Sequence, residues 1–277
     1  MTSPPWLSRT TLLVGEAKVI RLLEAHVLVV GLGGVGSFAA EFIARAGVGE
    51  MTIVDGDVID PTNRNRQLPA LATTHGQSKA ALMAERLMAI NPDMKLHVRN
   101  DFLTPEKADE ICQAAKYHYV MDCIDSITPK LHLIAAAKRH NLPIVSSMGA
   151  GGKLDPTRIR VADICDTHVD HFALHMRKRL KKKGIRKDLI SVFSDEAAPH
   201  SALMLTDGTN YKKSAYGTIS YLPAAFGGAC ASVVIRGLMG DPIELYQNKA
   251  LEDMKKRDIE RENKKRSTLY KKNIGEV

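Results

Sequence analysis

The sequence predicts an α/β fold built on a Rossmann-like, mostly parallel sheet with helices on both faces. Short β-branched apolar runs alternate with longer segments of helical periodicity, as expected for parallel strands joined by crossover helices. The first run leads directly into the glycine-rich turn GLGGVGS and then into a helical segment. The 277 residues are 44% apolar and 25% charged, which excludes a disordered polyelectrolyte and suits a globular chain.

The expected elements follow one another at the spacing of a doubly wound sheet. The helix after the glycine turn places Phe38, Phe42 and Ala46 on one face. Strands are expected at 26–30, 51–55, 95–99, 119–123, 143–148 and 158–164. Further helices are expected at 76–92 and 128–140.

The second half of the chain is less regular. After Asp166 the alternation loosens, and the apolar segment 219–238 indicates a return to the core. We therefore expect one domain over residues 1–250, with a long excursion that contains a basic loop at 177–212. Residues 251–277 are rich in lysine and in acids, which predicts a charged C-terminal helix or tail.

The longest uncharged window, 214–235, has 22 residues and is nominally long enough to cross a bilayer. Pro223, three glycines and several hydroxyl side chains interrupt it, which favours a buried strand, turn and helix over a membrane span. The first residues show no basic region followed by an apolar run, so no secretory signal is expected. These patterns predict a cytoplasmic chain with reduced thiols.

The glycine turn is the strongest functional signal. Gly31, Gly33, Gly34 and Gly36 follow a strand and open a helix, so a phosphate can approach the backbone and the helix N-terminus closely. Asp55 ends the second strand, where a carboxylate can accept hydrogen bonds from ribose hydroxyls. Both features suit a dinucleotide cofactor as well as ATP.

The residues after the ribose acid separate these two alternatives. The candidates in the segments TNRNRQ and GQSK are two cations and two carboxamides: Asn63, Arg66, Gln67 and Lys79. Hydride transfer does not need this much positive charge. An enzyme that splits the α-β bond of ATP must neutralise the charge that builds on pyrophosphate, so ATP is favoured.

The motif DCID closes the strand at 119–123 with two carboxylates. Ligands of open α/β sheets bind at the carboxyl ends of the strands, so Asp122 and Asp125 are expected to face the nucleotide. Asp125 is placed to hold a Mg²⁺ ion that bridges the phosphates.

In their order and spacing, GLGGVGS, IVDGD, NRNRQ, GQSK and DCID resemble the adenylating superfamily of ubiquitin-activating enzymes and sulfur-carrier activators. The resemblance covers about residues 9–165 and implies ATP as substrate. It implies catalytic roles for Arg66, Lys79 and Asp125, and a homodimer in which Arg9 reaches into the partner's site as an arginine finger. The expected nucleotide contacts are the four glycines, Asp55, Asp57, Asn63, Arg66, Gln67, Lys79, Asp122 and Asp125.

Later segments, VSSMGAGGKLDPTRIRVADI, SVFSDE and GTISYLPAAFG, resemble the tRNA threonylcarbamoyladenosine dehydratases. This resemblance implies ATP-dependent adenylation of the threonyl carboxylate in tRNA, followed by cyclisation with loss of water. It permits a K⁺ or Na⁺ ion, and a cysteine desulfurase or other sulfur-transfer protein as partner. Three alternatives stay open: an activator of a ubiquitin-like sulfur carrier, an NAD-dependent oxidoreductase, and an RNA-binding module with a degenerate nucleotide pocket.

Neither cysteines nor histidines predict a metal centre. The four cysteines form no Cys-x-x-Cys pair, so no zinc and no catalytic thioester are expected at Cys112, Cys123, Cys165 or Cys230. His171 and His175 lie one helical turn apart beside an apolar stripe, and we expect them to face solvent.

One basic segment accounts for the whole charge excess. Residues 177–187 hold eight Lys or Arg and no acid, against a formal net charge of +8. Such a block is either a solvated surface or a patch that follows the phosphates of tRNA, and no DNA partner is expected. The candidate RNA contacts are Arg177, Lys178, Arg179, Lys181, Lys182, Lys183, Arg186 and Lys187.

Overall fold

The computed structural model describes residues 2–205 and 214–248, and its main compact unit ends at Leu245. The predicted tail at 251–277 lies outside the described residues. The strands of the main sheet are β1 His26–Val30, β2 Glu50–Val54, β3 Lys95–Arg99, β4 Tyr119–Asp122, β5 Ile144–Ser147, β6 Ile159–Asp163 and β7 Ile190–Ser194. Two short strands, β8 Leu203–Leu205 and β9 Ser214–Tyr216, pair separately.

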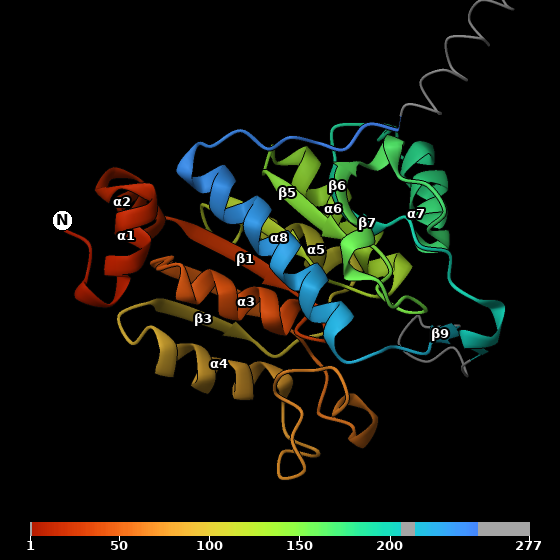
Figure 1. Ribbon diagram of the computed structural model, residues 1–277, viewed down its shortest axis with the longest axis horizontal. Helices are drawn as coiled ribbons and strands as arrows, with labels where there is room; N and C mark the ends of the chain where they lie inside the picture. The colour runs from red at the N-terminus through yellow and green to blue at the C-terminus, as the bar shows by residue number, and fades with distance from the viewer. Residues whose placement is uncertain (1, 206–213, 249–277) are drawn as a thin grey trace, which may run out of the picture. The chain divides into compact units, whose positions relative to one another are not determined.

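The seven strands form one sheet in the order β3-β2-β1-β4-β5-β7-β6 (Figure 1). Each neighbouring pair is parallel except β6 with β7, which is antiparallel. This confirms the predicted Rossmann-like, mostly parallel sheet. All six predicted strands are present, with bounds that differ by at most one residue at either end.

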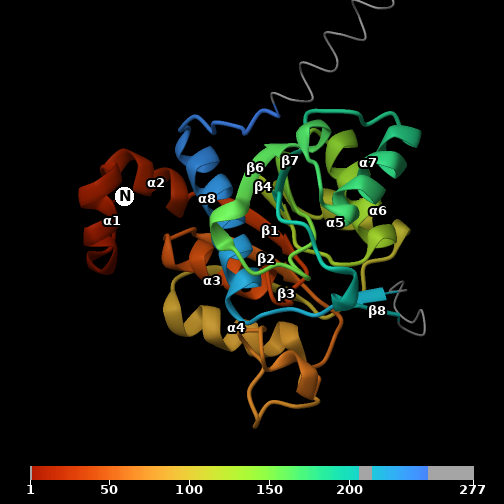
Figure 2. The same cartoon turned by 45° about the vertical axis from the view of Figure 1, so that its right-hand side comes forward.

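Helices cover both faces of the sheet. Their bounds are α1 Ser8–Val14, α2 Glu16–Leu23, α3 Gly36–Arg45, α4 Lys79–Ile90, α5 Pro105–Gln113, α6 Ile127–Arg139, α7 His171–Lys182 and α8 Tyr221–Met239. Single 3-10 turns occur at η1 Pro5–Leu7, η2 Pro61–Asn63, η3 Pro156–Arg158, η4 Ile164–Asp166 and η5 His200–Ala202. Figures 1 and 2 show α3, α4 and α8 on one face and α5 and α6 on the other.

The predicted basic loop at 177–212 is wrong over most of the length that the structure describes. The first basic residues belong to α7, and the chain returns to the sheet as β7, between β5 and β6. In β7, Ser191 and Ser194 are buried together with Val192 and Phe193. Two serines interrupt the apolar run of a strand buried on both faces, which is why the sequence pattern hides it.

Helix α3 is buried on a different side from the expected one. Phe42 is 39% exposed, whereas Ala39, Ala40 and Ile43 are completely buried. The reason is the close approach of α8, because a Cβ on Gly227 would lie 2.6 Å from the Val35 carbonyl oxygen. Small residues therefore occupy the closest part of the helix contact, and the partly exposed Phe42 ring lies beside Gly228.

By length and apolar composition alone, α8 passes the test for a membrane-spanning helix, yet half of its most apolar window is buried within the protein. Leu222, Phe226, Cys230 and Val234 are fully buried in the main core. The core helix that the sequence predicts for this segment is therefore present.

Candidate active site

The carboxyl ends of three adjacent strands form the edge that carries the predicted site. β1, in the middle, pairs with β2 on one side and with β4 on the other, so Val30, Val54 and Asp122 end side by side. The chain leaves β1 and β2 by α3 and α4 on one face, and it leaves β4 by α6 on the other (Figure 2). Such a switch point is where open α/β sheets bind their ligands.

The four glycines of the turn have different physical roles. Gly31 has a φ of +89°, and a Cβ on Gly36 would lie 1.7 Å from the Gly31 carbonyl oxygen. A Cβ on Gly34 would meet Pro223 at 3.0 Å, whereas one on Gly33 would meet only Gln67 Nε2, at 3.7 Å. Gly31, Gly34 and Gly36 are thus required by chain packing, and Gly33 is the position with open space for a ligand.

Asp55 ties the glycine turn to the loop after β2. Its Oδ2 accepts a hydrogen bond from the Leu32 N–H at 2.6 Å, and its Oδ1 accepts one from the Asp57 N–H at 2.8 Å. Burial raises the pKa of Asp55, while the Lys79 charge and these N–H groups oppose the rise. A carboxylate oxygen can accept more than one hydrogen bond, so Asp55 keeps capacity for ribose hydroxyls.

Lys79 begins α4 and is held by Asp57. The Lys79 Nζ lies 2.9 Å from Asp57 Oδ2, and the Lys79 side chain is 6% exposed against 44% for Asp57. The Lys79 N–H also donates to the Asp57 carbonyl oxygen at 3.0 Å. The structure therefore brings a nearly buried cation to the same edge, paired with an acid that is open to solvent.

η2 and the segment after it contain three more predicted residues, Asn63, Arg66 and Gln67. Asn63 is buried, and its Oδ1 accepts a hydrogen bond from the Asp60 N–H at 3.2 Å within a capping box. Arg66 is half-buried, and its Nη1 donates to the Thr62 carbonyl oxygen at 3.0 Å and to Asn65 Oδ1 at 2.9 Å. Asn63 thus shapes the loop, and the Arg66 side chain lies along it.

Gln67 carries an unsatisfied carboxamide oxygen beside the glycine turn. Among the described residues, its Oε1 is the buried side-chain polar atom that has no hydrogen-bond partner. Its Nε2 is the atom nearest to the open space beside Gly33. Because an unpartnered buried acceptor is costly, this carboxamide fits a ligand that donates a hydrogen bond beside the glycine turn.

The two carboxylates of DCID have separate environments, and the expectation for Asp122 needs correction. Asp122 and Lys130 are both fully buried and form an ion pair of 2.8 Å, and Asp122 Oδ2 also accepts the Ser146 hydroxyl at 2.7 Å. This carboxylate holds β4, β5 and α6 together and is not open to a nucleotide. Sequence spacing gave no signal that Lys130, eight residues later, is its partner.

Asp125 has the opposite environment. It is exposed in the loop between β4 and α6, at the carboxyl edge of the sheet. Its carboxylate oxygens are the ligand type that Mg²⁺ prefers, so the donor chemistry fits the predicted ion.

Arg9 does not join this edge within the same chain. It is exposed on α1, and the neighbouring Leu7 packs against Gly47, just beyond the C-terminal end of α3. The glycine turn lies at the N-terminal end of the same helix. Arg9 and the glycine turn of the same chain therefore lie toward opposite ends of α3.

Most of the basic candidates are exposed on the C-terminal half of α7 and the turn after it. The exception is Arg177, whose Nη1 donates to the Thr167 carbonyl oxygen at 2.8 Å and also to the Thr167 hydroxyl. Arg177 holds the start of this region in place, which corrects its assignment as an RNA contact. The seven exposed residues are Lys178, Arg179, Lys181, Lys182, Lys183, Arg186 and Lys187. His171 and His175 are exposed, as predicted.

The thiols have structural environments. Cys112 and Cys230 are buried, and burial raises the pKa of the Cys112 thiol to about 11. The neighbouring Cys230 side chain and burial together raise the pKa of Cys123. A thiol with a raised pKa is a poor nucleophile, so Cys112 and Cys123 act as small core residues, and Cys230 is a buried core residue as well.

A second buried ion pair, between Lys153 and Asp170, was not predicted from the sequence. Lys153 Nζ donates to the Gly149 carbonyl oxygen at 2.7 Å as well, and Asp170 caps α7 through the Ala173 N–H at 2.8 Å. The pair therefore fixes the glycine-containing turn after β5 against the start of α7.

Comparison with known proteins agrees with this geometry. The ThiF family model matches residues 7–273. The tRNA threonylcarbamoyladenosine dehydratase of Escherichia coli (strain K12) is 42% identical over 217 residues, which are 75% of this chain and 80% of the relative. The protein of the same name from Bacillus subtilis (strain 168) is 44% identical over 190 residues, which are 69% of this chain and 74% of the relative.

Solved structures extend the similarity. The crystal structure of E. coli tRNA N6-threonylcarbamoyladenosine dehydratase in complex with ATP aligns with a TM-score of 0.76 and 38% identity, covering 87% of this chain and 97% of that one. The E. coli sulfur carrier protein ThiS adenylyltransferase is 33% identical over 48% of this chain. Since the family model spans nearly the whole sequence and the nucleotide edge has the expected geometry, this chain belongs to the ThiF family.

Proposed function

We propose that this chain uses ATP to adenylate the threonyl carboxylate of threonylcarbamoyladenosine in tRNA and then closes that group into its cyclic form. The observation that carries the proposal is the 38% identity, over 87% of this chain, to an E. coli dehydratase solved with ATP. The sulfur-carrier activator is not favoured, because its similarity extends over only 48% of this chain.

The chemistry requires activation, because a carboxylate is a poor electrophile. One carboxylate oxygen attacks the α-phosphorus of ATP, pyrophosphate leaves, and an acyl-adenylate forms. The carbamoyl group of the same nucleoside then attacks the acyl carbon, AMP leaves with that oxygen, and a proton is lost. Attack within one molecule has an effective molarity on the order of 10⁵ M or more, so no enzyme thiol is needed.

Residues at the carboxyl edge divide this work. Lys79 would exchange Asp57 for the phosphates, and Arg66 lies in the neighbouring loop as a second cation. Asp55 would bind the ribose, and Gln67 Oε1 would gain a donor from the nucleotide. Asp125 would hold Mg²⁺, which supplies positive charge beside the phosphates when bound. A K⁺ or Na⁺ ion stays a prediction without an assigned site.

The reaction can be tested directly with the purified chain. We expect ATP and tRNA that carries threonylcarbamoyladenosine to yield AMP, pyrophosphate and a nucleoside lighter by one water in mass spectrometry. Unmodified tRNA and a ubiquitin-like sulfur carrier with a C-terminal glycine are the controls. AMP release with the carrier alone would replace this function by carrier activation, and NAD binding without any pyrophosphate release from ATP would indicate an oxidoreductase.

We place Arg9 in the active site of a second copy, because it is exposed on α1 and remote from the turn of its own chain. Arg9→Ala and Asp125→Ala chains, each inactive alone, should regain activity when mixed. The mixture contains dimers in which one site has both residues intact. No recovery in mixed dimers, shown to form by native mass spectrometry, would contradict this arrangement.

The exposed basic residues of α7 and the following turn are our candidates for the tRNA phosphates. Binding should weaken steeply with salt, and neutralising Lys181, Lys182 and Lys183 should reduce the slope of log K against log salt by about one per lost contact. The exposed Lys107 on α5 is the matched control. An unchanged slope would mean that tRNA binds to another surface of the protein.

A tRNA substrate also favours a cytoplasmic location. A sulfur-transfer protein as partner stays a prediction.

A further inference from the structure

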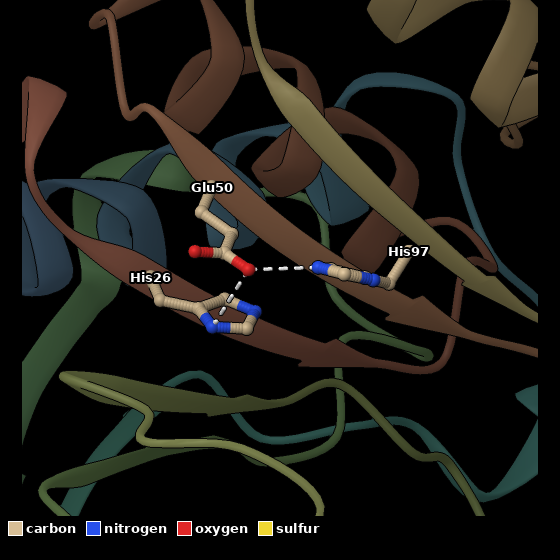
Figure 3. A group of neighbouring side chains, drawn as sticks. All are labelled: His26, Glu50 and His97. Atoms are coloured by element: carbon tan, nitrogen blue, oxygen red, sulfur yellow. Dashed lines mark hydrogen bonds and ion pairs between the residues drawn. The ribbon is translucent and has the colours of Figure 1, made fainter.

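Two histidines and a glutamate gather on the sheet away from the active site. His26, Glu50 and His97 come from β1, β2 and β3, and one ligand atom from each lies within 4.8 Å of the others (Figure 3). We propose that these three side chains form a binding site for a divalent transition-metal ion of the zinc class.

The strand register brings the three residues together. His26 on β1 is paired in register with Glu50 on β2, and Thr52, two residues later on β2, is paired with His97 on β3. Since side chains alternate along a strand, His26, Glu50 and Thr52 point to the face opposite to Val27 and Met51, which belong to the core. All three candidate ligands therefore lie on one face.

The distances suit a small metal ion. Glu50 Oε1 lies 2.7 Å from His97 Nε2 and 3.5 Å from His26 Nδ1 (Figure 3). Ligand atoms around a tetrahedral ion with bonds of about 2.0 to 2.2 Å are separated by slightly more than 3 Å, so small side-chain shifts suffice. Two imidazoles and one carboxylate, with water in the fourth position, form a known type of zinc ligand set.

Two neighbouring side chains orient His26, the buried metal ligand of the proposed site. His26 Nε2 hydrogen-bonds with the Thr52 hydroxyl at 2.9 Å, which leaves Nδ1 directed toward Glu50. The His26 ring also packs against Tyr117, with 4.7 Å between ring centroids. A hydrogen bond to the second nitrogen of a ligating histidine is the usual way in which proteins fix its orientation.

The site is open on one side. The side chain of His26 is 6% exposed, whereas those of Glu50 and His97 are 30% and 42% exposed, so an ion can enter from solvent. Lys95 Nζ forms an ion pair with Glu50 Oε1 at 2.9 Å. The Lys95 side chain is 68% exposed, so it can move outward into solvent. Lys95 is therefore a competitor that a bound metal would displace.

The position also indicates the effect of a bound ion. His26 and Glu50 are the first residues of their strands, whereas the nucleotide edge is at the last residues. An ion here would cross-link three adjacent strands without touching ATP, so it would stabilise the fold. The expectation of no zinc weighed cysteine pairs and the histidines of one helix, and neither pattern reveals histidines that come together from separate strands.

Zinc titration of the full chain, without an affinity tag, tests the proposal. Isothermal titration calorimetry should give one site, and Zn²⁺ at 100 times Kd should raise Tm by about 5 to 10 °C. Co²⁺ should give the visible absorption of a tetrahedral ion. His97→Gln and Glu50→Gln, both partly exposed positions, should abolish these signals. A His171→Gln, His175→Gln double variant should retain them, because that surface pair is not part of the site.

Two more variants test the geometry. Thr52→Val should weaken Zn²⁺ binding by roughly 10- to 100-fold, as expected for loss of an orienting hydrogen bond. Lys95→Met should tighten binding, because it removes the competing cation. The proposal fails if the wild-type chain shows no Zn²⁺-dependent rise in Tm. It also fails if binding survives in His97→Gln and disappears in the His171, His175 double variant.

Discussion

Two lysine–aspartate pairs lie near the same edge of the sheet and have nearly the same length. Lys79 and Asp57 are 2.9 Å apart, and Lys130 and Asp122 are 2.8 Å apart. In the first pair the aspartate is 44% exposed, whereas both side chains of the second are fully buried. Burial, and not distance, therefore decides which lysine can exchange its partner for a phosphate.

The surroundings explain this difference. Asp122 ends β4, and Lys130 Nζ also donates to the Ile124 carbonyl oxygen at 2.9 Å, so the buried cation has several partners. Removal of either charge would leave the other charge uncompensated in the core. Asp57 lies in an open loop, where water can replace Lys79 at little cost. The first pair suits ligand exchange and the second suits structure.

The largest effect is expected from Lys130→Met. It should lower the free energy of unfolding by about 3 to 5 kcal/mol, because Asp122 is left as an unpaired buried charge. Urea denaturation measures this loss. The Lys130→Met, Asp122→Asn double variant should recover part of it, since no net charge then remains in the core. A single variant as stable as the wild type would remove the distinction between the two pairs.

Lys79→Met should affect activity and not folding. The rate of AMP formation should fall by about 10²- to 10³-fold, which is typical for loss of one group that stabilises transition-state charge. The urea midpoint should stay close to that of the wild type. Lys107→Met, an exposed lysine on α5, is the matched control. Normal AMP formation by Lys79→Met would exclude phosphate exchange at this pair.

Gln67→Leu tests the nucleotide edge that contains the exchangeable Lys79–Asp57 pair. If a nucleotide donor bonds Gln67 Oε1, the variant should bind ATP up to about tenfold more weakly, the value of one hydrogen bond. Stability without ATP should not fall, because the wild-type atom has no partner to lose. Calorimetric titration with ATP measures the affinity. Unchanged ATP affinity would mean that the carboxamide serves the loop alone.

The smallest effect is expected from Asp57→Asn. The free energy of unfolding should change by about 1 kcal/mol or less, because Asp57 is partly exposed and the Asp55 carboxylate still balances the Lys79 charge. Asp122→Asn, the same chemical change in the buried pair, should cost several times more in the same denaturation assay. Equal costs for the two substitutions would show that burial does not separate the pairs.

The fold was predictable wherever local pattern and environment agree. The strands at 26–30 and 95–99 and the glycine turn follow from apolar runs and from residues that only one backbone geometry accepts. The sequence pattern did not reveal β7, because two of its residues are serines that are buried only through contact with neighbouring strands. The positions of Asp55, Asn63 and Lys79 at one edge were predictable, since parallel strands bring their following loops together.

The sequence by itself determined the element order, the glycine turn and the residue types that a nucleotide site needs. Only the tertiary structure decided which carboxylate forms the buried ion pair with Lys130 and that Arg177 donates to Thr167. It also decided that His26, Glu50 and His97 lie on one face of the sheet. The physical reason is that these outcomes depend on contacts between segments far apart in the chain. Burial and partner choice arise when strands pair and helices pack, and no local pattern encodes them.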